Sequence, residues 1–383
     1  MAQERRNWLN TLFLWGSLAL AAIALPIHLA VNGFRWSEWI VSLSMVFIIG
    51  TAISAGYHRL FSHRAYRAKA PWRALMLFFG AASFENSAMK WSSDHRIHHR
   101  HVDDLEKDPY AIGKGFGWAH WGWVMKGPDI PLQGVEDLKK DRLVVFQHDH
   151  IFLVGAAAAS IPLWIGLATG NFWGHLVVGL LVRIVLTHHT TFLINSAAHV
   201  FGSRPYTEEN SARDNWLLAP FTYGEGYHNF HHMWQWDYRN GAKWWQYDST
   251  KWILNLLRPT GLVSDFRRVP AAVMRRAELA VEAHRLQAKL AARAAEEHAF
   301  LHDRLAEARI RVDQALAAMH ERREAWARKR RELKVLGHAK AEAFRMAKAE
   351  WREHMARQKA EMAAAWAEWK RARRAARLAL SAA

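Results

Sequence analysis

Nine of the chain's 23 histidines fall at spacings that could hold metal ions. They form one pair five residues apart, two HxxHH triplets, and a single histidine four residues after an asparagine. In chain order they are His58 and His63; His95, His98 and His99; Asn195 with His199; and His228, His231 and His232. Residues three or four apart share a face of a helix, so each triplet can present its imidazoles together. A pair five apart is separated by about 140° on an ideal helix, so His58 and His63 need a helix end or another approach.

Nine imidazoles exceed what one ion can coordinate, and the adjacent histidines in two clusters also suggest two metals. Imidazole binds iron, copper, zinc and nickel. Zinc is redox-inert and would serve hydrolysis rather than oxidation. The sequence contains no cysteine, which excludes thiolate zinc sites, disulfides and a fused iron-sulfur or rubredoxin module within it. Any metal here must therefore rest on nitrogen and oxygen.

Four apolar stretches are long enough to span a bilayer, which takes about 20 residues in a helix. They cover residues 8–31, 37–56, 151–169 and 172–194. Short links near residues 32–38 and 169–171 join them into two hairpins. A shorter apolar stretch at 72–89 predicts a buried or partly inserted helix. The sequence thus predicts an all-α integral membrane protein in which four transmembrane helices carry a helical cap that holds the two metals.

The basic residues beside these stretches predict their orientation. Arg5 and Arg6 precede the first stretch and five Lys or Arg residues follow the second within residues 59–73, whereas the hairpin links contain only Arg35. Positive charge favours the cytoplasmic side, so we expect both termini to be cytoplasmic. Residues 57–150 and those from 195 onward, which contain the histidines, then form a cytoplasmic cap. The membrane would be the inner or plasma membrane in a bacterium, or the endoplasmic reticulum in a eukaryote.

Residues 271–383 differ from residues 1–270 and are expected to form a separate extension. They are rich in Ala, Arg, Lys and Glu, and Gly337 is their chief helix-breaking residue. Apolar positions recur mostly four or seven apart, which predicts a coiled coil or an amphipathic helix. These positions are Leu279, Leu286, Leu290, Leu301, Leu305, Val312 and Leu316.

The formal net charge of +17 and the isoelectric point of about 10.3 would suggest nucleic acid in a soluble protein. Here the basic residues border apolar stretches or lie in the extension. We therefore expect membrane lipid with an anionic surface as the partner, and not nucleic acid.

With these motifs assembled, the first 270 residues resemble the membrane fatty acid desaturases of the stearoyl-CoA (delta-9) type. The likeness consists of an HxxxxH, an HxxHH, an NSAAH and a GEGxHNxHH block in the same order. It extends to Asp108-Pro109, Gly122-Trp123 and Asp237-Tyr238. The resemblance implies a non-haem di-iron centre and dioxygen as co-substrate. It also implies removal of two hydrogens from a saturated acyl chain to give a cis double bond, with delta-9 as the expected position.

The same resemblance implies roles for individual residues. The iron ligands would be His58, His63, His95, His98, His99, His199, His228, His231 and His232, with Asn195 reaching one metal through water. Asn86, Trp91 and Thr191 would line the bend of the acyl tunnel. His188 and His189 lie within the fourth apolar stretch and are expected to line the tunnel or support the ligands, since polar groups in a membrane span usually face a cavity.

Several departures from the family pattern leave the acyl carrier open among CoA, a phospholipid and a carrier protein. Ser93 stands where acyl-CoA members have an arginine, Gly127 and Pro128 replace a basic pair and leave only Lys126, and Glu85 replaces a glutamine of the tunnel wall. Two electrons per turnover would come from a separate donor of the cytochrome b5, ferredoxin or rubredoxin type. Two alternative functions are an acyl hydroxylase with the same di-iron site and a non-catalytic membrane scaffold that presents the C-terminal coil.

Overall fold

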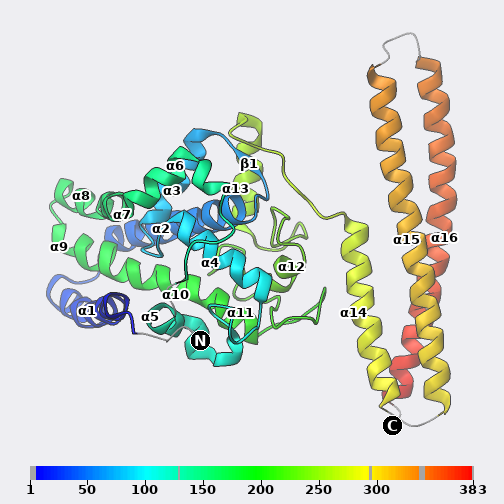
Figure 1. Cartoon of the computed structure of the whole chain (residues 1–383), viewed down its shortest axis with the longest axis horizontal. Helices are drawn as coiled ribbons and strands as arrows, with labels where there is room; N and C mark the ends of the chain where they lie inside the picture. The colour runs from blue at the N-terminus through cyan, green and yellow to red at the C-terminus, as the bar shows by residue number, and fades with distance from the viewer. Residues whose placement is uncertain (1–5, 128–129, 293–295, 336–340, 382–383) are drawn as a thin grey trace. The chain divides into compact units, whose positions relative to one another are not determined.

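The computed structural model describes residues 6–127, 130–292, 296–335 and 341–381 (Figure 1). The chain separates into two units. The first consists of Met1–Arg204 with Glu208–Arg268, and the second of Pro205–Thr207 with Val269–Ala383. Both units are mostly helical, as the sequence predicts.

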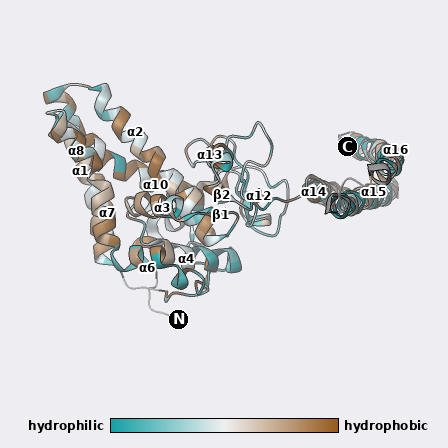
Figure 2. Ribbon diagram, turned by 90° about the horizontal axis from the view of Figure 1, so that it is seen from above, coloured by the Kyte–Doolittle hydropathy of each residue, from teal (hydrophilic) through white to brown (hydrophobic). Residues whose placement is uncertain are grey.

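Within the described residues, four helices are long and apolar enough to cross a membrane, which confirms the predicted number. They are Trp8–Asn32 (α1); Trp36–Ser62, which joins α2 (Trp36–Thr51) to η1 (Ala52–Ser62); Ile151–Ala168, which joins α7 (Ile151–Ala159) to α8 (Ile161–Ala168); and Phe172–Val200, which runs through α9 (Phe172–Gly174), η5 (His175–Val182), α10 (Arg183–Asn195) and α11 (Ala197–Val200). Apolar residues run along these helices in Figure 2. On α1, Leu9, Ile23 and Val31 are 70%, 62% and 76% exposed, which suits contact with lipid.

The second of these helices extends six residues beyond the predicted end at residue 56, and its last part is a π-helix. In η1 the hydrogen bonds join residues five apart, and the His63 N–H continues this pattern with a bond of 3.1 Å to the His58 carbonyl. The wider turn brings residues five positions apart close together. The rings of His58 and His63 accordingly lie 4.8 Å apart. The π-helix thus brings together two residues that an ideal α-helix would separate by about 140°.

The apolar stretch at 72–89 does not form one helix. Helix α3 (Ala70–Ala81) ends early, and α4 (Ala88–His101) begins after Ser87, whose hydroxyl accepts from the Lys90 N–H. Phe84 and Asn86 between them have positive φ values of 58° and 78°, a conformation that no helix allows. This turn is tied to the fourth span by Arg183, whose Nη1 donates to the Ala82 carbonyl at 2.7 Å.

The rest of the first unit forms the helical cap. Its further elements are η2 (Ile112–Lys114), η3 (Trp118–Gly122), α5 (Trp123–Lys126), η4 (Leu138–Lys140), α6 (Arg142–Asp149), α12 (His228–Met233), α13 (Ser249–Leu257) and η6 (Arg258–Thr260). Two short antiparallel strands, β1 (Arg67–Ala68) and β2 (Val263–Ser264), join its two halves. A buried core that includes Tyr57, Trp72, Val144 and Leu254 packs η1 against α3, α6 and α13. The cap therefore holds the end of the second span rigidly.

At the opposite end of the spans, a buried polar cluster joins the two hairpins. The His28 Nε2 of α1 lies 2.8 Å from Oε2 of Glu38 at the start of α2. Oε1 of Glu38 accepts from the Asn171 side chain at 2.7 Å. Since Glu38 is fully buried, the two partners compensate the cost of placing a carboxyl group inside the bundle.

The second unit is a bundle of α14 (Ala271–Ala291), α15 (Glu296–Val335) and α16 (Ala341–Ser381). The predicted helical extension is confirmed and, in its described residues, consists of three helices; Gly337 itself lies outside them. Six of the seven predicted apolar positions are buried and Leu316 is partly buried against the same core, which also contains Trp369. The apolar stripe is thus covered within the unit itself.

Candidate metal centre and its cavity

The nine predicted histidines come together in two groups that could each hold a metal ion. Within each group, one ligand atom from every residue lies within 4.8 Å of the others. The first group is His58, His63, His95, His99 and His231; the second is His98, His199, His228 and His232. Each HxxHH triplet therefore contributes to both groups, because adjacent residues such as His98 and His99 point about 100° apart on a helix.

The Nε2 atoms converge inside both groups. The separation is 2.8 Å from His63 to His95 and 2.9 Å from His231 to both His58 and His99. In the second group, Nε2 of His232 lies 3.1 Å from that of His228. An imidazole that binds metal through Nε2 commonly donates its Nδ1–H to an outer acceptor, which fixes the ring and its tautomer.

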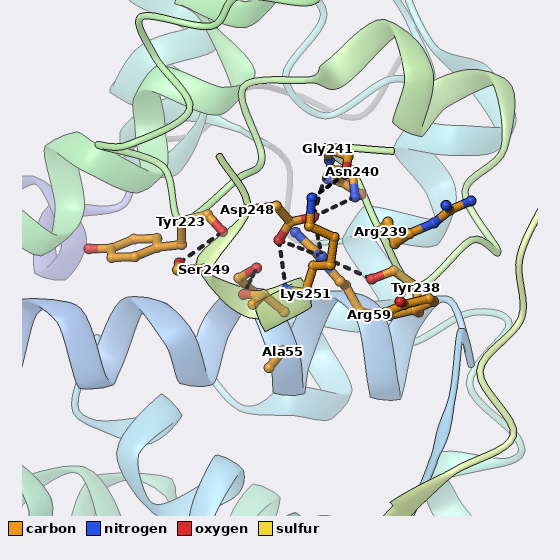
Figure 3. A network of polar contacts seen from close by, with 12 residues as sticks. Ala55, Arg59, Tyr223, Tyr238, Arg239, Asn240, Gly241, Asp248, Ser249 and Lys251 are labelled. Carbon is orange, nitrogen blue, oxygen red and sulfur yellow. Dashed lines mark hydrogen bonds and ion pairs between the residues drawn. The ribbon is translucent and has the colours of Figure 1, made fainter. Parts of the chain in front are cut away.

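Glu225 occupies this outer position beside His58. Its Oε2 lies 2.8 Å from Nδ1 of His58, and Arg59 donates to its Oε1 through Nη2 at 2.9 Å. Arg59 also reaches Asp248 at 3.0 Å, and Asp248 accepts from the N–H groups of Asn240 and Lys251 (Figure 3). All of these side chains are buried. Burial alone would raise the pKa of Glu225, but Arg59 and His58 hold it at about 2, so Glu225 stays a carboxylate.

Asp108 and Ser211 are outer acceptors for histidines of the second group. Oδ1 of Asp108 lies 2.8 Å from Nδ1 of His98, and the Ser211 hydroxyl lies 2.7 Å from Nδ1 of His199. Ser211 in turn donates to Asp103. The sequence motifs predicted no role for Asp108 and no partner for Glu225, although both residues lie within those motifs.

The residues fit a pair of metal ions. Burial, followed by the neighbouring imidazoles, lowers the pKa of the cap histidines well below the ordinary value, so these rings are neutral and offer lone pairs. The histidines concerned are His63, His95, His99, His228, His231 and His232. Nε2 of His199 is buried and has no hydrogen-bond partner within the described chain, as expected of an atom reserved for a metal. Neutral imidazoles that converge on two centres are the donors that a transition metal prefers.

A cavity of about 630 Å³ reaches the first group from the side of α1, α4 and α10. His58, His95 and Asn195 lie in its wall, together with all three residues predicted to contact substrate, Asn86, Trp91 and Thr191. The ring of Trp91 also stacks on His95, with centroids 4.7 Å apart. Asn195 thus lies in the wall shared with two of the histidines, and the predicted water-mediated ligation remains a prediction.

The two histidines of the fourth span have different neighbours. His188 lines the cavity, and its Nε2 lies 2.8 Å from the Ser83 carbonyl. Nδ1 of His189 instead lies 2.9 Å from Nε2 of His120, whose Nδ1 contacts Ser196.

Glu85 brings a carboxyl group to the cavity wall. The Trp91 indole N–H donates to its Oε2 at 3.4 Å, and burial raises its pKa to about 8. At neutral pH the wall beside Trp91 is therefore mostly uncharged, which suits an apolar ligand.

The fold and the site define a membrane protein with a histidine-rich metal centre at the end of an apolar cavity, and sequence comparisons agree with this class. Residues 34–266 match the model of the fatty acid desaturase family. A probable acyl-CoA desaturase of Schizosaccharomyces pombe is 39% identical over 69% of this chain, and acyl-CoA desaturase 1 of Saccharomyces cerevisiae is 37% identical over 75%. The sn-1 stearoyl-lipid 9-desaturase of Anabaena variabilis is 32% identical over 68%.

The chain belongs to the fatty acid desaturase family and is an integral membrane protein. The match spans 55% and 57% of the length of the two yeast relatives, whereas it spans 94% of the cyanobacterial one.

Proposed function

We propose that the protein is an oxygen-dependent fatty acyl desaturase that introduces a cis double bond, with delta-9 as the expected position, into a saturated acyl chain. This proposal rests on one observation: the apolar cavity ends at the first histidine group. Nine imidazoles converge in two groups, and a largely apolar cavity ends at two of them, His58 and His95.

The metals would be two iron ions, held by the nine histidines with Asn195 through water. When bound, they would supply, with dioxygen, the oxidising power that removes hydrogen from an unactivated methylene. No acid or base of the chain could attack such a carbon, so the apolar cavity itself argues for a metal oxidant.

The chain's own residues orient the ligands and the substrate. Glu225 and Asp108 fix the rings of His58 and His98 and so keep their Nε2 atoms directed inward. The Trp91 ring connects the two parts of the site, because it stacks on His95 and also lines the cavity. An acyl chain that packs against Trp91 and Thr191 would be held next to the metals, and this placement would select the carbons that react.

The acyl carrier is proposed from the cavity lining. Lys90 lies in the wall and forms an ion pair of 2.7 Å with Asp94, while Asn7 and Asn10 contribute uncharged polar groups. The described lining therefore has little net positive charge for a polyphosphate. We favour an acyl group on a membrane lipid over acyl-CoA, and the relatives' names include both kinds.

The decisive experiment is expression in a desaturase-deficient host, followed by mapping of double bonds in lipid and CoA fractions by mass spectrometry. We expect a new monounsaturated chain and about two iron ions per purified protein. A hydroxylated chain would instead indicate the hydroxylase. If the protein retains no iron and forms neither product with a donor present, the proposal is wrong and the non-catalytic scaffold gains support.

Two ligand variants sharpen the test. His98→Ala and His231→Ala, one from each group, should abolish product formation and lower the iron content while the protein still inserts in the membrane. His150→Ala is the matched control because His150 is exposed and belongs to neither group. Substantial turnover by either ligand variant would contradict the assignment.

We also propose that both termini and the cap are cytoplasmic. Because the sequence has no cysteine, single cysteines can report this directly. Ser37→Cys, exposed near the start of α2, should be labelled only from outside the cell or from the lumen. Ser264→Cys, exposed on β2, should be labelled only from the cytoplasm, and the reverse pattern would overturn the orientation.

A further inference from the structure

The last part of α16 carries charge of one sign. Residues 341–369 of this helix contain five Lys or Arg and five Glu, whereas residues 370–381 contain five basic residues and no acidic one. These five are Lys370, Arg371, Arg373, Arg374 and Arg377. The end of the helix therefore has a positive charge that its own sequence does not balance.

A shallow groove runs along this end of the helix, which is drawn in red in Figure 1. Four of the residues that line it recur at positions i, i+4, i+7 and i+11, which lie on one face of a helix. The lining, which we call the basic groove, consists of Lys370, Arg373, Arg374, Arg377, Leu378 and Ser381.

The cations of the basic groove are only partly paired inside the C-terminal unit. Oε1 of Glu282 on α14 lies 3.2 Å from Nη1 of Arg373 and 2.9 Å from Nη2 of Arg377, so one carboxylate serves two guanidinium groups. Lys370 and Arg374 are exposed and form no ion pair or hydrogen bond with the part of the chain that the structure describes. These two side chains can therefore bind an anion without losing an internal partner.

The helix dipole accounts for little of this charge. The C-terminal end of an α-helix has a partial negative charge that favours cations, but the effect falls off within the last turn. Lys370 lies eleven residues before Ser381, the last residue of α16, which is about three turns away. The positive charge near Lys370 is therefore available to an anionic partner.

We propose that the basic groove binds the phosphate groups of anionic phospholipids at a membrane surface. The chain is an integral membrane protein, so its C-terminal unit is covalently tethered to a bilayer. Guanidinium groups bind phosphate oxygens in pairs. Leu378 is 58% exposed among the arginines and would enter the boundary between headgroups and acyl chains, which neither nucleic acid nor free phosphate offers. This inference needs neither iron nor turnover, so it is independent of the proposed function.

The test uses the metal-free full chain in lipid nanodiscs, with a fluorophore on Ser381→Cys, since the sequence has no other cysteine. Energy transfer to a headgroup-labelled lipid reports the ratio of membrane-bound to free C-terminal unit. We expect strong transfer in discs of phosphatidylcholine with phosphatidylglycerol, and weak transfer in phosphatidylcholine alone. Added salt should weaken the transfer in the anionic discs. Equal transfer in both kinds of disc would overturn the inference.

Two double variants locate the interaction in the groove. Lys370→Glu with Arg374→Glu should lower the ratio of bound to free unit at least about tenfold in anionic discs, because each basic residue near the surface adds to the attraction. Lys370→Gln with Arg374→Gln introduces no new charge and should lower the ratio less. Lys348→Glu with Arg352→Glu is the matched control, an exposed pair with the same spacing on α16 and no partner among the described residues.

The control should bind like wild type. An equal loss in the control would show that net charge, and not the groove, attracts the lipid. Unchanged binding by both groove variants would equally contradict the assignment.

A labelled RNA duplex, added to the chain in phosphatidylcholine discs, tests a second source of phosphate. Wild type should bind this duplex no better than Lys370→Glu with Arg374→Glu does. If wild type binds it tightly, the variant does not, and lipid composition has no effect, the groove serves nucleic acid and the lipid assignment is wrong.

Discussion

Replacement of Asp108 by asparagine would test how far the outer acceptors determine metal binding. The Asp108 carboxylate is buried and accepts three hydrogen bonds: Oδ1 from His98 Nδ1–H at 2.8 Å and from Tyr110 N–H at 3.1 Å, and Oδ2 from Asp103 N–H at 3.0 Å. An amide has one acceptor oxygen. Asp108→Asn can therefore keep the two bonds at Oδ1 only by losing the bond from Asp103.

Two effects follow from this loss. The broken bond to a charged acceptor should cost the metal-free protein about 1.5–3 kcal/mol of unfolding free energy. Removal of an outer-sphere carboxylate typically weakens metal binding about 10–100-fold, which corresponds to about 1.4–2.7 kcal/mol. Among the described residues Asp108 forms an ion pair with His98 and with no arginine, so the substitution leaves no arginine without its partner.

The assay is a competition between the purified protein and an iron chelator, together with thermal unfolding of the metal-free form. The variant should give up the metal of the second group first. Asp137→Asn is the control, since it breaks surface ion pairs with Arg64 and Arg96 but contacts no histidine. If Asp108→Asn holds two irons as tightly as wild type does, Asp108 does not tune the centre as argued.

Three further predictions concern buried polar groups. Glu225→Gln should lower iron affinity and also destabilise the metal-free protein by about 3 kcal/mol or more, because it breaks the buried ion pair with Arg59; unchanged thermal unfolding would contradict this. Folded Glu85 keeps its proton up to about pH 8, whereas the unfolded chain loses it near pH 4.5, so wild-type stability should fall between these values. The stability of Glu85→Gln relative to wild type should accordingly rise from pH 4.5 to 8 and then level off, and a pH-independent difference would refute the assigned cause. Gly174→Ala would place a methyl group against Glu38 and should cost about 1–3 kcal/mol without loss of iron, whereas Gly16→Ala, which meets open space, should be neutral.

Local periodicity was sufficient to predict the spans and the histidine clusters. A membrane helix is recognised by about 20 consecutive apolar residues, and an HxxHH triplet by the helical repeat, so both can be read from neighbouring residues. Neither prediction needed knowledge of which segments pack together. Local patterns did not indicate Asn86, Trp91 and Thr191, which were predicted to contact substrate only from the family resemblance. The fold shows that all three line one cavity.

The parts that sequence reasoning missed depend on long-range packing. Glu225 meets Arg59 across 166 positions of the chain, and no local pattern reveals that pairing. The π-helical end of the second span could not be predicted either, because its stability comes from the packing of Tyr57, Leu60 and Phe61 in the cap core. Helical spacing separates the adjacent histidines of each HxxHH triplet, but which histidines of α4 and α12 meet in one group depends on how the two helices pack.

The seven apolar positions of the C-terminal unit bear on the scaffold alternative. A helix that presents a coiled-coil seam to a partner must leave its apolar stripe accessible. Here Leu279, Leu305 and Val312 are at most 1% exposed within the unit's own core, and Leu286 is 8% exposed beside them. These residues therefore do not form an exposed coiled-coil seam. What the unit does expose is charge, since residues 271–383 contain 26 Lys and Arg against 15 Asp and Glu. A partner of this unit would thus be recognised mainly through acidic groups, whereas the proposed chemistry would rest on the histidines of the first unit.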